Sequence, residues 1–127
     1  MILGMDLTNS TSLDAVWPFV SNTEAIGVNQ AWDGEPGQLR WSGFQPYYDV
    51  VTKRLGRSAG GLPEVAVLVV NKDLSDLSVK LPLQLFGLPT AGTYTVRDIW
   101  NHEDVGTLSI GPGGANSTWA VEKVPAQ

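Results

Sequence analysis

Short apolar segments that alternate with polar residues make up most of the chain after residue 37. Glycine, proline, asparagine and aspartate, which favour turns, separate these segments. Short strands at this spacing are typical of an antiparallel β-sandwich or barrel. We therefore expect strands near residues 38–41, 48–54, 65–71, 77–81, 93–99, 106–110 and 119–124.

Two of these segments differ in how their apolar residues are spaced. Residues 65–70 are apolar at every position, which predicts a central strand covered on both faces, with Val67 and Leu68 largely buried. Residues 77–81 alternate leucine or valine with serine or lysine. That alternation predicts a strand with one face in water.

The first 36 residues have a different texture. Residues 1–5 are an apolar run that predicts a fully buried strand of a parallel sheet. Residues 8–12 are small and polar, which is typical of a loop and a helix cap. Pro18 should shorten or kink the helix that follows. The apolar residues of that helix recur at helical spacing, at Leu13, Val16, Trp17 and Val20.

Asn22 has the properties of an N-cap and predicts a second stretch of helix, with Glu24 inside it. The turn-rich residues 33–37 then mark a junction. We expect two units, a strand-helix unit over residues 1–36 and a β-sandwich over residues 37–127.

Charge and cysteine content exclude several classes of function. The net charge is −5 and the eight basic residues are scattered, which argues against nucleic-acid binding. The absence of cysteine excludes disulfides and thiolate metal sites. No run is long enough to span a membrane, and the N-terminus lacks the features of a signal peptide, so the sequence assigns no compartment. We expect neither a cofactor nor a metal.

One polar run contains the only histidine. A metal site would need several ligands at fixed spacing around that histidine, whereas a hairpin turn in water needs only polar residues. We favour the solvated turn, with a β-bulge near residues 98–100 where the apolar alternation slips. The run consists of Asp98, Asn101, His102, Glu103 and Asp104.

The tryptophans allow two interpretations. Exposed aromatic faces could stack on sugar rings, and Trp32 and Trp41 are the candidates for this role. Tryptophans in a small sandwich more often fill the core, and we favour the core for the set as a whole. The set consists of Trp32, Trp41, Trp100 and Trp119.

Three stretches resemble the C-terminal portion of the α-galactosidase (melibiase) family of glycoside hydrolases. They are residues 1–7 (MILGMDL), residues 22–30 (NTEAIGVNQ) and residues 94–102 (YTVRDIWNH). The resemblance implies that residues 1–36 are a remnant of a (β/α)₈ barrel, its last strand and the helix that follows. It also implies an antiparallel β-sandwich behind them. A full-length parent would be a retaining, exo-acting hydrolase of terminal α-galactosides.

The same resemblance implies that this chain lacks the catalytic carboxylates. In the family these are aspartates on earlier barrel strands, and no motif here matches them. We therefore expect no catalytic residue and no activity from the chain alone. Asp6, just past the first strand, is a candidate for substrate binding, and a loop or capping role is the alternative. The family is usually secreted, lysosomal or vacuolar.

Two further functions stay open, a non-catalytic carbohydrate-binding module and a structural subunit that docks through residues 1–30. The expected barrel strand lacks its neighbouring strands, so its edge should recruit another chain. The partner would be another copy of the chain, a separate barrel fragment or a larger assembly. We expect the contact to include Ile2, Leu3, Met5, Leu13, Val16 and Trp17.

Overall fold

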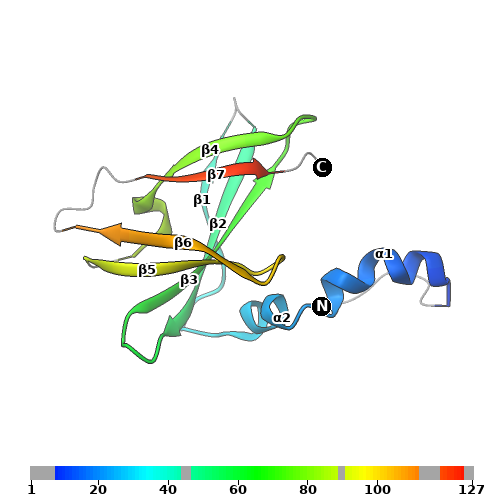
Figure 1. The fold of residues 1–127 in the computed structure, drawn as a ribbon, viewed down its shortest axis with the longest axis horizontal. Helices are drawn as coiled ribbons and strands as arrows, with labels where there is room; N and C mark the ends of the chain where they lie inside the picture. The colour runs from blue at the N-terminus through cyan, green and yellow to red at the C-terminus, as the bar shows by residue number, and fades with distance from the viewer. Residues whose placement is uncertain (1–7, 44–46, 89–90, 112–117, 125–127) are drawn as a thin grey trace.

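A computed structural model describes residues 8–43, 47–88, 91–111 and 118–124 of the chain (Figure 1). Two helices, α1 (Ser10–Val20) and α2 (Thr23–Gln30), precede the strands. A short 3₁₀ helix, η1 (Leu83–Phe86), follows the fourth strand. The strands are β1 (Gln38–Ser42), β2 (Tyr48–Arg57), β3 (Pro63–Asn71), β4 (Leu77–Pro82), β5 (Gly92–Asp98), β6 (Glu103–Ile110) and β7 (Thr118–Val124).

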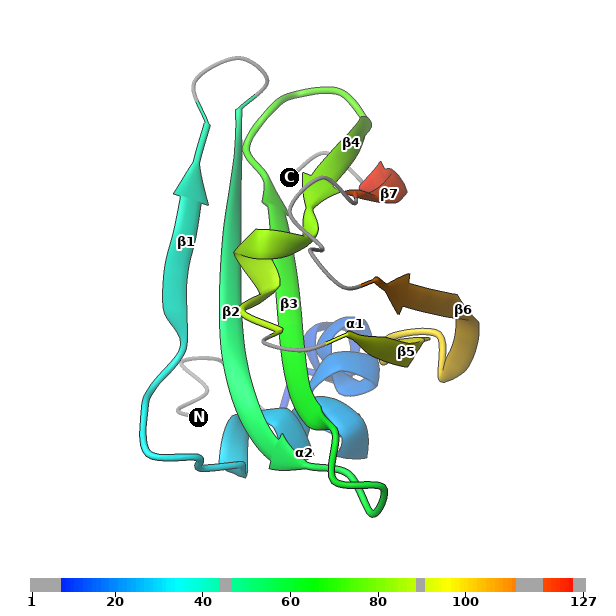
Figure 2. The ribbon, with the colours of Figure 1, turned by 90° about the vertical axis from the view of Figure 1, so that its left-hand side faces the viewer.

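The strands form three antiparallel groups. β1, β2 and β3 make a three-stranded sheet in that order, β4 pairs with β7, and β5 pairs with β6. Both two-stranded groups lie on one side of the three-stranded sheet, with η1 over β2 and β3 (Figure 2). The architecture is mainly β and consistent with the expected sandwich.

The core lies between these groups. Its buried apolar residues come from β2, β4, η1 and β6, so it joins the three-stranded sheet to both smaller groups. The prediction of one wet face for residues 77–81 is confirmed, because Val79 and Leu81 are buried while Ser78 and Lys80 are exposed. The core residues are Val50, Val79, Leu81, Leu83, Phe86 and Leu108.

The prediction that residues 65–70 form a central strand is wrong. Within the described residues β2 is the middle strand and β3 pairs with β2 alone. Val67 is 38% exposed and Leu68 is 48% exposed. Leu68 lies opposite Val51 on the outer face, which none of the described strands covers, and both Val67 and Leu68 belong to β3, an edge strand of the described sheet (Figure 2). An apolar run predicts burial on both faces, but within the described residues a second layer of strands covers only one face of this sheet (Figure 2).

The bulge predicted at residues 98–100 lies elsewhere. Val96 pairs with Gly106 and Arg97 pairs with Asp104, so Val105 is the extra residue and the bulge belongs to β6. Gly106 has φ 152, and a Cβ on it would lie 3.4 Å from the ring of Trp119 on β7. The bulge therefore depends on glycine, both for its backbone conformation and for the close approach of a neighbouring strand.

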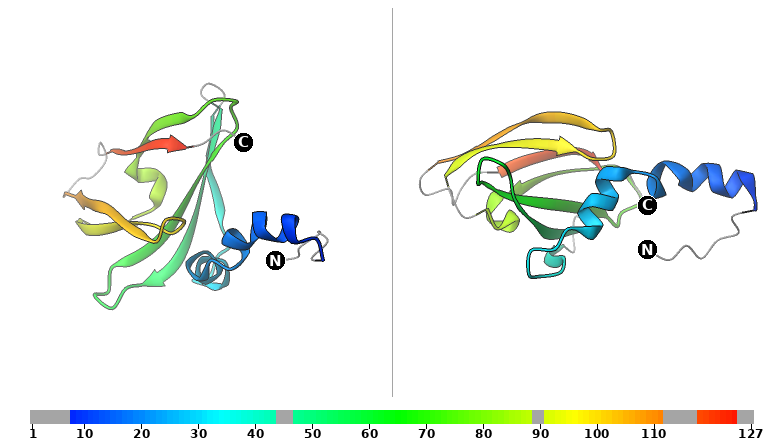
Figure 3. Two further views of the ribbon diagram at one scale, coloured as in Figure 1. Left: turned by 45° about the vertical axis from the view of Figure 1, so that its right-hand side comes forward. Right: turned by 90° about the horizontal axis from the view of Figure 1, so that it is seen from below.

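α1 begins within residues 8–12, where a cap was expected, and α2 begins at the predicted cap Asn22. The Asn9 side chain accepts from the Ser12 N–H at 3.1 Å, and the Asn22 side chain accepts from the Ala25 N–H at 3.0 Å. Pro18 lies inside α1, near its end, without terminating it. α1 extends away from the strands in Figure 1 and in both views of Figure 3. In the described part of the chain, no helix has the length and apolar character needed to cross a membrane.

Candidate functional site

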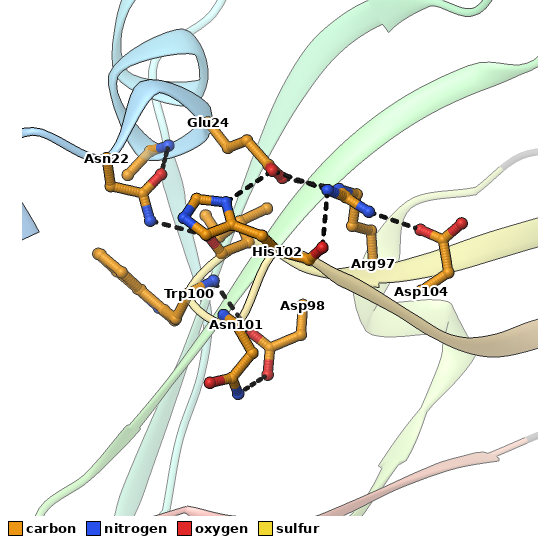
Figure 4. Close-up of polar contacts among 10 residues, drawn as sticks. Asn22, Glu24, Arg97, Asp98, Trp100, Asn101, His102 and Asp104 are labelled. Carbon is orange, nitrogen blue, oxygen red and sulfur yellow. Dashed lines mark hydrogen bonds and ion pairs between the residues drawn. The ribbon is translucent and has the colours of Figure 1, made fainter. Parts of the chain in front are cut away.

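A cluster of polar side chains joins the start of α2 to the turn between β5 and β6 (Figure 4). Asn22 lies at its centre and is only 5% exposed. Its Oδ1 accepts the Ala25 N–H that begins α2, and its Nδ2 donates to the Ile99 carbonyl of the turn at 2.8 Å. One side chain therefore both caps the helix and attaches it to the hairpin.

Glu24 and Arg97 form a two-pronged ion pair beside Asn22. The Arg97 Nε donates to Glu24 Oε2 and its Nη2 donates to Glu24 Oε1, both at 2.8 Å. The Arg97 Nη1 also donates to Asp104 Oδ1 at 3.0 Å, and its Nη2 donates to the His102 carbonyl at 3.0 Å. Two parallel charged hydrogen bonds fix the angle between the helix and the hairpin as well as their distance.

His102 completes the cluster from the turn. Its Nδ1 lies 2.8 Å from Glu24 Oε1, and its backbone has φ 58, in the left-handed region. Among the described residues other than glycine, His102 alone has a positive φ. Such a conformation costs a side-chain-bearing residue energy, which the contacts with Glu24 and Arg97 offset.

Asp98 organises the turn itself. Its Oδ1 accepts the N–H groups of Trp100 and Asn101 at 2.9 and 3.1 Å, and its Oδ2 accepts from the Asn101 side chain at 2.8 Å. Burial alone would raise the pKa of Asp98, but the hydrogen bonds from Asn101 and Trp100 outweigh it and lower the pKa. Asp98 is thus an ionised turn-forming group.

α2 is also held at its other end. Lys53 on β2 donates from Nζ to the Val28 and Asn29 carbonyls at 2.7 and 2.9 Å. These carbonyls belong to the last turn of the helix, where a positive charge is favourable. An aromatic contact adds to the joint, between Phe19 of α1 and Trp100 of the turn, with ring centroids 5.9 Å apart and edge-on.

The ion pairs of this cluster predict that the contact between α2 and the hairpin weakens in acid. Hydrogen bonds from Arg97 and then from His102 lower the pKa of Glu24 from 4.5 to about 2. Because this pKa is depressed in the folded state, the pair stabilises the joint above pH 4.5 and is lost as the pH falls toward 2. We expect an NMR titration of the Glu24 carboxyl to give a midpoint near the lower value. Arg97→Met should raise that midpoint toward the ordinary glutamate range, with the His102 contact left in place, while Lys72→Met, which removes a cation that does not contact Glu24, should not move it.

The cluster is suited to joining rather than to chemistry. Each of Glu24, Asp98 and Asp104 accepts a hydrogen bond from a neighbouring residue, and Glu24 and Asp104 both pair with Arg97. In the part of the chain that the structure describes, no group of three or more histidine, aspartate or glutamate residues is placed to hold a metal ion. The solvated turn favoured from the sequence is confirmed, since residues 100–104 are exposed. The attachment of α2 to this turn was not predicted.

A hollow of about 320 Å³ lies where β2 ends and β3 begins. Among the residues that line it, the only carboxylate is that of Asp33, which pairs with Arg54 at 3.0 Å. This hollow therefore offers no pair of free carboxylates either.

The tryptophans divide differently from the prediction. Trp119 packs against the core as expected, but Trp32, Trp41 and Trp100 are 69%, 47% and 51% exposed. Trp32 lies in the segment between α2 and β1, Trp41 follows an irregularity in the edge strand β1, and Trp100 lies in the hairpin turn. All three lie at a sheet edge, in a turn or in a connecting segment, and this position outweighs the usual preference of tryptophan for the core.

The remaining predicted residues belong to the N-terminal segment. Asp6, Ile2, Leu3 and Met5, and the strand expected over residues 1–5, lie outside the described residues. Leu13 and Val16 are half-buried on α1, and Trp17 is 58% exposed.

The comparisons with known proteins give one finding. A family model described as the alpha galactosidase C-terminal beta sandwich domain matches residues 45–123, which include β2 to β6 and most of β7. No curated protein and no solved structure matches the chain.

Proposed function

Because the chain belongs to the family of α-galactosidase C-terminal β-sandwich domains, we propose that it is the non-catalytic C-terminal part of an α-galactosidase-like glycosidase. The family match implies the α-galactosidase-like parent. The proposal adds that the parent is a retaining, exo-acting enzyme for terminal α-galactosides and that residues 1–36 belong to its barrel. The sandwich would then support the enzyme without touching the reacting bond.

The observation that supports a non-catalytic role is the state of the carboxylates in the polar cluster. A retaining glycosidase needs two carboxyl groups about 5 Å apart, one of them a nucleophile and the other a protonated acid. Glu24 and Asp104 share Arg97, and hydrogen bonds from Arg97 and then from His102 lower the pKa of Glu24 to about 2. A carboxyl group held ionised in this way cannot deliver the proton that the leaving group needs.

The purified chain is therefore expected not to hydrolyse an aryl α-galactoside above the rate in buffer alone. Release of the aryl group over hours, at pH values from 4 to 7 that bracket the usual carboxyl and histidine ranges, would measure this. Glu24→Gln and Asp6→Asn serve as comparisons. Turnover that survives repurification and is lost in either variant would contradict the proposal.

A docking role for residues 1–30 deepens this function. α1 extends away from the strands, and Trp17 and Phe19 on it are 58% and 60% exposed. The outer face of the three-stranded sheet is also apolar, since Leu39, Val51 and Leu68 lie opposite one another across its three strands. Exposed apolar surface of this kind is typical of an interface. The occupant that fits the family is the rest of the barrel.

Deleting residues 1–30 is expected to leave the sandwich folded and to abolish association with a separately expressed barrel. Sedimentation of the mixture and of each chain alone would measure the association, at tens of micromolar, a range that covers most specific interfaces. Trp17→Ser offers a smaller change at an exposed position. A complex that survives the deletion would contradict docking through this segment. A chain that forms dimers by itself would identify a second copy as the occupant instead.

Carbohydrate binding is the second candidate, favoured by the exposure of Trp32 and Trp41. Sugar rings that stack on these side chains would quench their fluorescence in a titration, and the quenching would be lost on Trp32→Ala or Trp41→Ala. A purely structural domain would show no change.

A further inference from the structure

The N-terminal helices are attached to the sandwich in a different way from the strands. We call residues 9–30 the helical arm. No residue of α1 or α2 is buried, and none is among the apolar residues packed against the core. Ile26 and Val28 are half-buried at most. Little apolar burial is therefore available to hold the arm in place.

Polar contacts take the place of that burial, at both ends of α2. At its start Asn22 donates to the Ile99 carbonyl, and Glu24 pairs with Arg97 and His102. At its end Lys53 donates to two carbonyls of the last turn. We call this set the polar clamp. The four residues that receive the helix belong to β2, β5 and the hairpin turn, elements with hydrogen-bond ladders of their own.

We infer that the helical arm is a separable strap, which releases from the sandwich as a unit while the strands stay folded, and that the polar clamp determines how readily it releases. Regions with few buried apolar contacts open locally at a lower free energy than the core does. Exposed ion pairs are also screened by salt, with a Debye length of about 30 Å at 0.01 M and about 3 Å at 1 M. Release should therefore increase with ionic strength.

Glu24 is the residue on which the clamp depends most. The N-terminal end of a helix has a partial positive charge, and Arg97 lies beside this end of α2. Without the Glu24 charge, Arg97 would face the positive end of the helix and repel it. Glu24→Gln therefore does more than remove an attraction, since the glutamine leaves a repulsion in its place.

Two substitutions at Asn22 separate its role as the cap of α2 from its hydrogen bond to the hairpin turn. Asn22→Asp keeps an oxygen that caps the Ala25 N–H but removes the donor to the Ile99 carbonyl. Asn22→Ala removes both. If the link to the hairpin holds the arm, the aspartate variant should release the arm while α2 keeps its cap.

Amide hydrogen exchange on the full chain, read residue by residue, tests the inference. Amides of residues 10–30 are expected to exchange about tenfold faster at 1 M than at 0.01 M salt, while those of β2 and β6 should be unchanged. Glu24→Gln and Asn22→Asp should produce a similar increase at low salt. Lys72→Gln is the matched control, because it breaks an exposed ion pair with Asp49 that lies outside the clamp.

Three results would overturn the inference. The arm and the strands could exchange at one common rate, which would mean that they open together. Arm exchange could be indifferent to salt, with Glu24→Gln no different from Lys72→Gln. The arm could also lack protection at low salt, which would mean that the clamp does not hold it. The inference rests on these contacts alone, so a failure of the proposed glycosidase relationship would leave it intact.

Discussion

Replacing Leu81 with alanine is expected to lower the free energy of unfolding by about 2–5 kcal/mol, the range for a leucine removed from a packed core. Leu81 is 1% exposed and lies on β4, whose apolar face belongs to the core formed with β2, η1 and β6. The substitution removes buried methyl groups and leaves a cavity that the paired strands cannot easily close. Urea unfolding monitored by tryptophan fluorescence would measure the change.

Leu68→Ala is the matched comparison. The residue type and the substitution are the same, but Leu68 is 48% exposed on the uncovered face of β3. Its loss should cost under about 1 kcal/mol, as is usual for surface positions. Equal losses at Leu68 and Leu81 would contradict the position of the core between the strand groups.

Asn71→Ala is expected to cost about 1–3 kcal/mol for each buried polar group that it leaves unpaired. Asn71 is 2% exposed, and its Nδ2 donates to the Ser75 carbonyl at 2.8 Å and to the Val124 carbonyl at 3.1 Å. Its Oδ1 accepts the Asp73 N–H at 2.9 Å. The side chain therefore joins the end of β3, the turn that follows and the end of β7.

Thermal unfolding of Asn71→Ala beside Asn101→Ala would measure this effect. Asn101 also forms a side-chain hydrogen bond, to Asp98 at 2.8 Å, but it is exposed, so water replaces what alanine removes. Only the Asn71 variant should be strongly destabilised. A small effect at Asn71 would indicate that water reaches the Val124 carbonyl.

The sequence predicts the strands well because each depends on local signals. The alternation of apolar and polar residues in β4 predicts that Val79 and Leu81 are buried. The helices begin at Asn9 and Asn22, whose side chains cap residues only three positions further along the chain. The order of strands in the sheet depends on pairings between distant segments, which local patterns do not contain. The apolar run of β3 therefore predicts a central strand of the sheet. In the structure, the apolar residues of β3 face the core on one side and an uncovered surface on the other.

The polar cluster likewise combines a turn that neighbouring residues predict with a pairing between distant residues that they do not. The turn at residues 98–102 was predicted, because Asp98 and Asn101 are turn-forming residues close together in the chain. The pairing of Glu24 with Arg97 was not predicted. The two residues are far apart in sequence, and glutamate and arginine are both residue types that commonly occur on a protein surface. One signal could have found it. Both residues lie in stretches that resemble the same family, and such stretches are expected to meet.

The pairing of β4 with β7 determines the order in which this domain should fold. β1, β2 and β3 are consecutive, and so are β5 and β6, so each of these groups can form after closing only a short loop. β4 and β7 are separated by η1 and the whole β5–β6 hairpin. Closing a longer loop costs more chain entropy before any contact compensates, and such contacts slow folding. We expect the hairpins to form early and the joining of β7 to β4 to be the rate-limiting step that completes the core.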